Sequence, residues 1–182
     1  MFIMINAENI IEKYYPKESP LYHILITHSR QVRDKALEIV DQHPELEIDR
    51  QFVSEATMLH DIGIYLCNAP KIHCVGSAKY IEHGYLGADL LRKEALPRHA
   101  LVAERHTGTG IKLEEIRQNN LPLPHRNMEP VSIEEQVICY ADKFYSKSNL
   151  NAEHSLEHIR KSLSKFGEET VLKFDEWHRL FG

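Results

Sequence analysis

The feature that most constrains this chain is one long stretch of helical periodicity. Ser19 followed by Pro20 is a helix start signal, because serine caps a helix N-terminus and proline fits the first helical position. Apolar residues then recur at helical spacing until the chain reaches Pro44. They are Leu21, Ile24, Leu25, Val32, Ala36, Ile39 and Val40. Such a helix must bury its apolar stripe, so other elements have to cover it.

Most other segments have the same period and carry helix start signals. Asn6 can cap a short first helix, and Asp49 can cap the helix that leads to residue 60. Ser132 and Glu135 form the pattern of a capping box, which begins a further helix. Further helices are expected near 81–95, 97–106 and 112–119 and in two amphipathic C-terminal segments. Residues 64–80 and 121–130 contain prolines and are expected to be loops. With no convincing strand, the predicted class is all-α, a compact helical bundle.

Length, net charge and cysteine content exclude some classes of function. A chain of 182 residues suits one domain, and its net charge of -5 argues against a nucleic-acid-binding surface as the main function. Three cysteines without Cys-x-x-Cys spacing predict reduced thiols in a cytoplasmic protein. The apolar start, residues 1–5, is too short for a signal peptide, and no stretch is long enough to span a membrane. The oligomeric state is left open.

Histidine and aspartate interrupt these apolar stripes. His28 lies between Ile24 and Val32 at helical spacing, His60-Asp61 ends another apolar stretch, and Asp142 follows Ile138 by one helical turn. Each residue alone has an ordinary alternative, a core histidine or an ion-paired aspartate. Together they favour a metal site, because buried carboxylates need a cation or strong hydrogen bonds. Imidazole and carboxylate ligands suit iron, manganese, zinc or magnesium. Gly63 is expected to end the helix as a C-terminal cap.

These residues carry a family resemblance. The order His28, His60-Asp61, Asp142 resembles the H…HD…D pattern of the HD-domain superfamily of metal-dependent phosphohydrolases, and residues 60–63 match its HDIG variant. The resemblance covers about residues 20–147 of a single domain, 1–182, which adds an N-terminal helix and a C-terminal helical extension. It implies the family's helical fold. It also implies that these four side chains coordinate a divalent metal ion.

The resemblance extends to a second metal site. The segment that begins at His83 is similar to the third histidine region of binuclear HD proteins, and His106 lies where those proteins place a fourth. The implied arrangement has Asp61 bridging two ions, with His83 and His106 completing the second site. His99 is expected to have a structural role or to lie at the protein surface. Surface or local structural roles are expected for His73, His125, His154, His158 and His178.

Within the superfamily, the chain resembles small uncharacterised HDIG proteins of bacteria and archaea, and residues 104–111 and 140–143 carry this likeness. HD-type diadenosine tetraphosphate hydrolases are more loosely similar. The chain lacks the Glu-Asp pair of guanosine tetraphosphate hydrolases and the Gly-Tyr-Pro motif of cyclic-di-GMP phosphodiesterases. Ile64 also stands where the latter often carry lysine, which makes cyclic dinucleotides less favoured substrates.

The expected activity is hydrolysis of a phosphoester or phosphoanhydride bond in a nucleotide or another small phosphorylated molecule. A divalent ion lowers the pKa of bound water, and Asp61 would orient the nucleophile. Lys143, beside Asp142, is the first choice for holding the phosphate, with Arg33 and Arg105 as alternatives. Two other functions stay open: a di-iron oxygenase built on the same ligands, and a catalytically silent metal-bound regulatory module.

Overall fold

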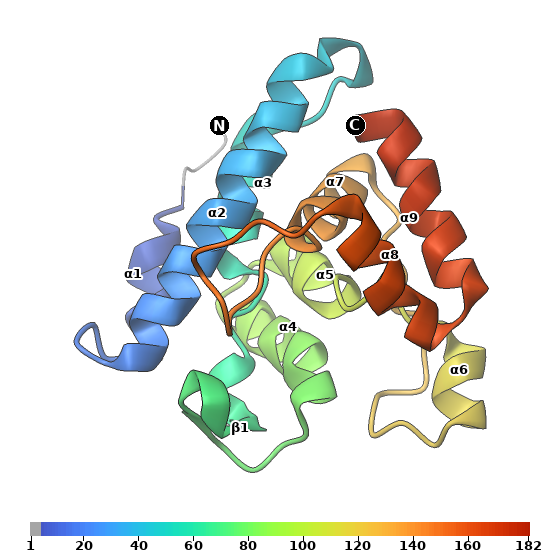
Figure 1. The fold of residues 1–182 in the computed structure, drawn as a ribbon. Coiled ribbons are helices and arrows are strands. Elements are labelled where there is room, and N and C mark those ends of the chain that lie inside the picture. The colour runs from blue at the N-terminus through green and yellow to red at the C-terminus, as the bar shows by residue number, and fades with distance from the viewer. Residues whose placement is uncertain (1–4) are drawn as a thin grey trace.

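The structure, a computed structural model, describes residues 5–182; the first four residues of the apolar start lie outside this range. It confirms an all-α class. The helices are α1 Ala7–Ile11, α2 Pro20–Gln42, α3 Arg50–Leu59, α4 His83–Lys93, α5 Pro97–Arg105, α6 Leu113–Gln118, α7 Ile133–Asp142, α8 Leu156–Leu163 and α9 Glu168–Phe181. In Figure 1, α5 and α7 lie centrally, with the long α2 on one side and the α8–α9 pair on the other.

The predicted helix starts are present. The side chain of Asn6 accepts a hydrogen bond from the amide of Asn9, and Ser19 does the same for Tyr22. Ser132 accepts from the amide of Glu135, but the return half of the capping box is not made. The Glu135 carboxylate instead accepts from the Val131 amide, 3.0 Å away, and from an arginine of α5.

The segment 64–80 is more ordered than a loop. It contains two 3₁₀ turns, Ile64–Leu66 and Pro70–Ile72, and two antiparallel strands, β1 Asn68–Ala69 and β2 Cys74–Val75. A third 3₁₀ turn, Tyr80–Glu82, leads into α4. Each strand has two residues. That is too short for an alternating pattern to reveal it, which is why the sequence predicts no strand here.

Two apolar clusters form the interior. One joins the C-terminal half of α2 to α3, α7, α8 and α9; the other joins α1 and the N-terminal half of α2 to α4 and α5. On α2, Leu25 belongs to the second cluster and Val32 to the first, so His28 lies where the two meet. The helix thus carries a polar side chain into the boundary between two packed cores.

Gly63 does not act as a helix cap, so that part of the sequence prediction is wrong. Helix α3 already ends at Leu59, and Gly63 has φ of -83°, which is not the left-handed conformation of a capping glycine. A Cβ at this position would lie 2.3 Å from the carbonyl oxygen of His83 and 2.5 Å from the amide nitrogen of Gly87. The missing side chain therefore lets the turn at 60–63 pack directly against α4.

Across residues 5–182, no helix has both the length and the apolar composition that crossing a membrane requires. The three cysteines are free, and all three are buried.

Candidate metal centre

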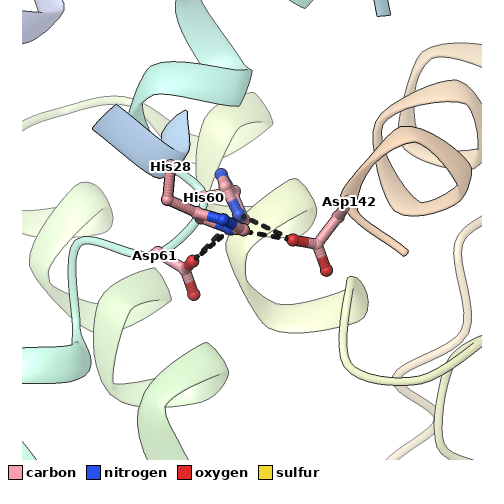
Figure 2. Close-up of side chains that lie close together, drawn as sticks. All are labelled: His28, His60, Asp61 and Asp142. Carbon is pink, nitrogen blue, oxygen red and sulfur yellow. Dashed lines mark hydrogen bonds and ion pairs between the residues drawn. The ribbon is translucent and has the colours of Figure 1, made fainter. Parts of the chain in front are cut away.

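Six predicted ligand side chains come together at the boundary between the two apolar clusters. His28 comes from the middle of α2, His60 and Asp61 from the turn after α3, and Asp142 from the last residue of α7. His83 is the first residue of α4 and His106 follows the last residue of α5; all six side chains are buried. Five elements far apart in sequence thus meet at one point, and Figure 2 shows four of the side chains, His28, His60, Asp61 and Asp142.

Four of these side chains form one candidate ligand group: His28, His60, Asp61 and Asp142. His28 Nε2 lies 3.0 Å from Asp142 Oδ1 and 3.3 Å from Asp61 Oδ2. His60 Nε2 lies 3.0 Å from Asp61 Oδ2 and 3.5 Å from Asp142 Oδ1. Two imidazole nitrogens and two carboxylate oxygens therefore face a common centre.

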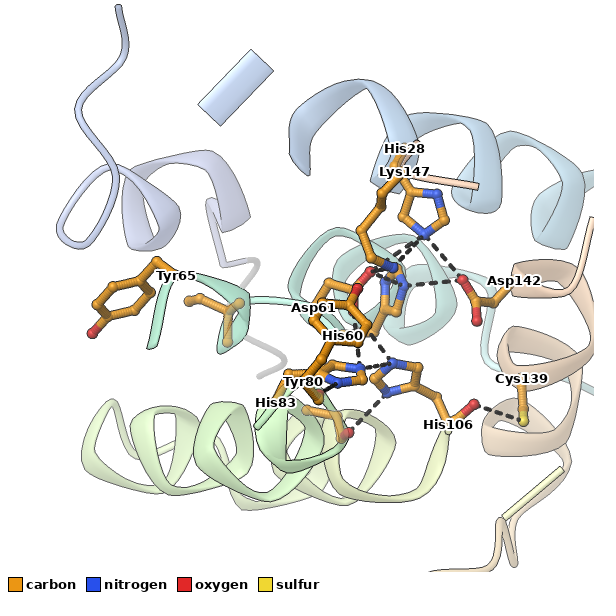
Figure 3. A network of polar contacts seen from close by, with 12 residues as sticks. His28, His60, Asp61, Tyr65, Tyr80, His83, His106, Cys139, Asp142 and Lys147 are labelled. Carbon is orange, nitrogen blue, oxygen red and sulfur yellow. Dashed lines mark hydrogen bonds and ion pairs between the residues drawn. The ribbon is translucent and has the colours of Figure 1, made fainter. Parts of the chain in front are cut away.

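Asp61 also belongs to a second candidate group. Its other oxygen, Oδ1, lies 3.4 Å from His83 Nε2 and 3.3 Å from His106 Nε2. Asp61, His83 and His106 form a second candidate ligand group, which shares the Asp61 carboxylate with the first (Figure 3). One carboxylate oxygen therefore faces each group, which is the arrangement of a bridging ligand.

Backbone carbonyls fix the orientation of three imidazoles. His60 Nδ1 lies 2.6 Å from the carbonyl oxygen of Thr57, and His83 Nδ1 lies 2.6 Å from that of Tyr80. His106 Nδ1 lies 2.8 Å from the carbonyl oxygen of Ala103. A carbonyl can only accept, so Nδ1 carries the proton in each ring. When the imidazoles are neutral, their Nε2 lone pairs point into the centre, because the hydrogen bond at Nδ1 fixes both the tautomer and the orientation of each ring.

The donor set fits divalent metal ions. His83 Nε2 and His106 Nε2 lie 3.0 Å apart, and with both protons on Nδ1 neither can donate to the other. Buried polar atoms of the centre also lack a hydrogen-bond partner among the described residues, including His60 Nε2 and Asp61 Oδ1. Lone pairs that converge without donors are stabilised by a cation, and nitrogen and oxygen donors of this kind suit zinc, manganese or iron.

The surrounding charges shift the pKa values of the centre. Burial raises the pKa of Asp61, but His60 and Lys147 lower it more, so that it lies well below its usual range. Burial also raises the pKa of Asp142, but nearby positive charges, above all Lys143, bring it well below its usual range. Without metal, burial lowers the pKa of His60 but the Asp61 carboxylate raises it to about 9. Metal binding therefore has to release the His60 proton.

In the second ligand group, the pKa values of the histidines are lowered, in contrast to that of His60. Burial, followed by the neighbouring His106, lowers the pKa of His83 to about 3, and burial also lowers that of His106. Both rings are therefore neutral at physiological pH and can serve as ligands without losing a proton.

Two lysines accompany the centre, and the sequence identifies only one of them. Lys143 Nζ donates to Asp142 Oδ2 at 2.9 Å and to the His106 carbonyl at 3.1 Å. Lys147 Nζ lies 2.5 Å from Asp61 Oδ2 and 3.4 Å from His28 Nε2. Lys147 stands in a loop after α7 with no periodic pattern. A cation five residues after a candidate ligand is too weak a signal to find it in advance.

The two arginines considered as alternatives are engaged elsewhere. Arg33 pairs with Asp34 at 2.7 Å, and Arg105 pairs with Glu135 at 3.0 Å. His99 is buried and lies 3.3 Å from Glu55, in keeping with the structural alternative. Among residues 5–182, His73, His125, His154, His158 and His178 stay outside both ligand groups.

Comparison with known families explains this arrangement. The HD domain family matches residues 25–147, which include all six ligand candidates and both lysines. The chain belongs to the HD domain family. This HD domain thus agrees with the resemblance carried by the H…HD…D residues.

Known relatives of this HD domain include longer proteins. A tRNA (cytidine(56)-2'-O)-methyltransferase of Picrophilus torridus is 32% identical over 148 residues, which is 76% of this chain but only 39% of that protein. An uncharacterized protein of Methanocaldococcus jannaschii is 32% identical over 121 residues, 65% of this chain and 64% of the relative. The chain thus spans about two fifths of the methyltransferase, whose activity is a property of the longer protein.

A solved structure supports the fold. The HD domain of the L. monocytogenes phosphodiesterase PgpH superposes with a TM-score of 0.52, covering 92% of this chain and 94% of that domain, at 16% identity. At this identity the likeness shows that the helices share one arrangement. It makes the helical architecture of this HD domain secure.

Proposed function

We propose that this HD domain is a metal-dependent phosphohydrolase that cleaves a phosphoester or phosphoanhydride bond in a small phosphorylated molecule such as a nucleotide. One observation carries the proposal: the two oxygens of the buried Asp61 carboxylate face two separate sets of imidazole nitrogens. A pair of divalent ions held in this way lowers the pKa of water and polarises a phosphoryl oxygen. The net charge of -5 favours a small substrate over a nucleic acid.

In this proposal the ligands divide into two sets. His28, His60 and Asp142 hold one ion, and His83 with His106 holds the other, with Asp61 shared between them. The lowered pKa of Asp61 keeps its carboxylate ionised throughout the neutral range. Its role is therefore to hold cations and orient the attacking water, because so weak a base stores no proton.

Lys143 supports this arrangement through a ligand. Its ammonium group bridges Asp142 Oδ2 and the His106 carbonyl, and thereby connects residues of both ligand sets. We therefore assign it a positioning role. The alternative that it holds the substrate phosphate remains a prediction, and the variants described in the Discussion separate the two.

The test is turnover by the purified protein after reconstitution with one defined metal at a time: iron(II), manganese, zinc or magnesium. The substrate panel includes nucleoside mono-, di- and triphosphates, dinucleoside polyphosphates and simple phosphate esters. Because the relative from Picrophilus torridus is named as a tRNA methyltransferase, the panel also includes short RNA fragments. We expect phosphate release with at least one metal, and loss of that activity in Asp61→Asn. The exposed Asp89→Asn is the matched control and should retain full activity.

Absence of hydrolysis would favour one of the two other functions. If the protein holds two ions and hydrolyses nothing on the panel, the phosphohydrolase proposal is wrong. Oxygen consumption by the iron(II) form would then indicate the di-iron oxygenase, and its absence the non-catalytic module.

A further inference from the structure

A cavity opens beside the metal centre. It has a volume of about 330 Å³, and its walls include Lys71, Tyr80, Asp142, Tyr145, Ser146 and Lys147. Asp142 is both a wall of the cavity and a candidate metal ligand, so a molecule bound there would touch the centre directly. A volume near the lower end of known ligand pockets suits a small molecule rather than a polymer.

Lys147 connects the cavity to the ligands. Its side chain is 13% exposed, and its ammonium group reaches Asp61 Oδ2 at 2.5 Å and His28 Nε2 at 3.4 Å (Figure 3). A flexible four-carbon stem carries this charge, so the ammonium can meet an anion that enters the cavity next to Asp61.

The loop that carries Lys147 is fastened to α2. Gln31 Nε2 donates to the Leu150 carbonyl at 2.7 Å, and Lys35 pairs with Glu153 at 2.6 Å. Within the loop, the hydroxyl groups of Ser146 and Ser148 are 2.9 Å apart. Because α2 also presents His28, these contacts fasten the loop that carries Lys147 to the helix that carries a candidate ligand.

The charge of the cavity wall favours an anion. The wall contains two lysines and one acid, and that acid, Asp142, already accepts from Lys143 and contacts His28. Lys71 is exposed, on the 3₁₀ turn Pro70–Ile72. The Lys71 ammonium is therefore available to a ligand, whereas that of Lys147 has to move from Asp61 Oδ2 to meet one. Two tyrosine rings provide apolar wall on which an organic group can pack.

We propose that this cavity is the substrate site of the HD domain and that Lys147, assisted by Lys71, binds the phosphate group of a small phosphate monoester. This proposal rests on the proposed phosphohydrolase function and names its substrate class. A monoester is favoured over a diester because its phosphate carries a second negative charge, which two ammonium groups can match. Lys147 is then a catalytic residue that contacts the reacting group, whereas Lys143 acts through Asp142.

The test measures ligand binding directly, so it does not depend on turnover. Isothermal titration of the metal-loaded protein uses three probes: inorganic phosphate, a nucleoside 5'-monophosphate and the corresponding 3',5'-cyclic monophosphate. We expect the 5'-monophosphate to bind more tightly than the cyclic diester. Lys147→Gln should weaken phosphate and monoester binding about tenfold or more, since it removes a charged hydrogen-bond donor. Lys147→Arg keeps the charge and should restore part of the affinity.

Two controls separate a binding role from a structural one. Lys161→Gln changes an exposed lysine on α8 and should leave all affinities unchanged. At saturating metal, the metal content of Lys147→Gln should equal that of the wild type, because the Lys147 ammonium competes with a cation for Asp61 Oδ2 and does not help to hold one. Metal loss in this variant, or phosphate affinity equal to the wild type with both ions present, would overturn the proposal.

The same experiment distinguishes failure of this proposal from failure of the proposed function. If phosphate binds through Lys147 but no panel substrate is hydrolysed, the cavity assignment stands as a phosphate site and the hydrolase assignment falls. If substrates are hydrolysed but the KM of Lys147→Gln equals that of the wild type, the hydrolase assignment stands and the cavity assignment falls.

Discussion

His83 and His106 bring their Nε2 atoms to 3.0 Å of each other while each ring donates its Nδ1 proton to a backbone carbonyl. Two lone pairs held this close repel each other unless a cation lies between them or a ring is protonated. Burial lowers the pKa of both rings and so opposes protonation. The fold therefore holds the two Nε2 atoms in a position where a metal ion between them would remove their repulsion.

Removing the shared carboxylate should remove the metals. Asp61 contacts both histidine sets, so Asp61→Ala should lose most of the bound metal from both sites. Metal analysis by mass spectrometry of protein purified under identical conditions checks this. Asp89→Ala is the matched control. Equal metal content in Asp61→Ala and the wild type would contradict the assignment.

Removing one histidine of the second group should separate the two sites. His106 contacts Asp61 Oδ1 but is absent from the group formed by His28, His60 and Asp142. His106→Ala should therefore reduce the bound metal from about two ions to about one per chain, as expected for a two-metal site that loses one ion. If the variant keeps two ions, or loses both as Asp61→Ala does, the division of ligands proposed here is incorrect.

Lys143 should affect metal binding more than substrate binding. Its ammonium group contacts Asp142 Oδ2 and the His106 carbonyl. Lys143→Met should therefore weaken metal affinity, whereas phosphate affinity at saturating metal should match the wild type. Metal titration followed by calorimetry with inorganic phosphate makes the comparison. The opposite pattern, normal metal affinity with weak phosphate binding, would restore Lys143 as the phosphate-holding residue.

Gly63→Ala should destabilise the protein by more than an ordinary glycine substitution. The new Cβ would meet the His83 carbonyl oxygen at 2.3 Å, and two backbone segments would have to separate. Overpacking of this kind costs about 1–3 kcal/mol or more. Gly108→Ala is the control: Gly108 has φ of 60° and open space around it, so only the penalty for a left-handed backbone, about 1–2 kcal/mol, applies. Urea unfolding of both variants tests the difference.

The metal-free protein should lose stability on mild acidification. Unfolded histidine binds a proton near pH 6.5, whereas the pKa of folded His83 is about 3. The unfolded state therefore binds more protons in this interval, and the free energy of unfolding falls as the pH drops through it. His83→Gln should lower the proton uptake on unfolding by about one. A His83→Gln variant with the wild-type slope would contradict the shifted pKa.

Local patterns in the sequence determined the helices and the identity of the ligand candidates. The Ser19-Pro20 start, the caps at Asn6 and Asp49 and the stripe along α2 depend on interactions within a few residues, and all are present in the structure. The same local reasoning failed at Gly63. Its role is set by contacts with α4, which lies twenty or more residues further along the chain.

The tertiary structure decided everything that depends on contacts between segments. Only the packing of α2, α4, α5 and α7 places the two Asp61 oxygens against different histidines. It also turns Lys143 toward a ligand and brings Lys147, from an irregular loop, to the centre. Periodicity reports which face of a helix is buried, but it carries no information about which distant side chain lies opposite. That is the physical reason why the sequence identified the ligand candidates and left the shape and charge of the cavity beside them to the fold.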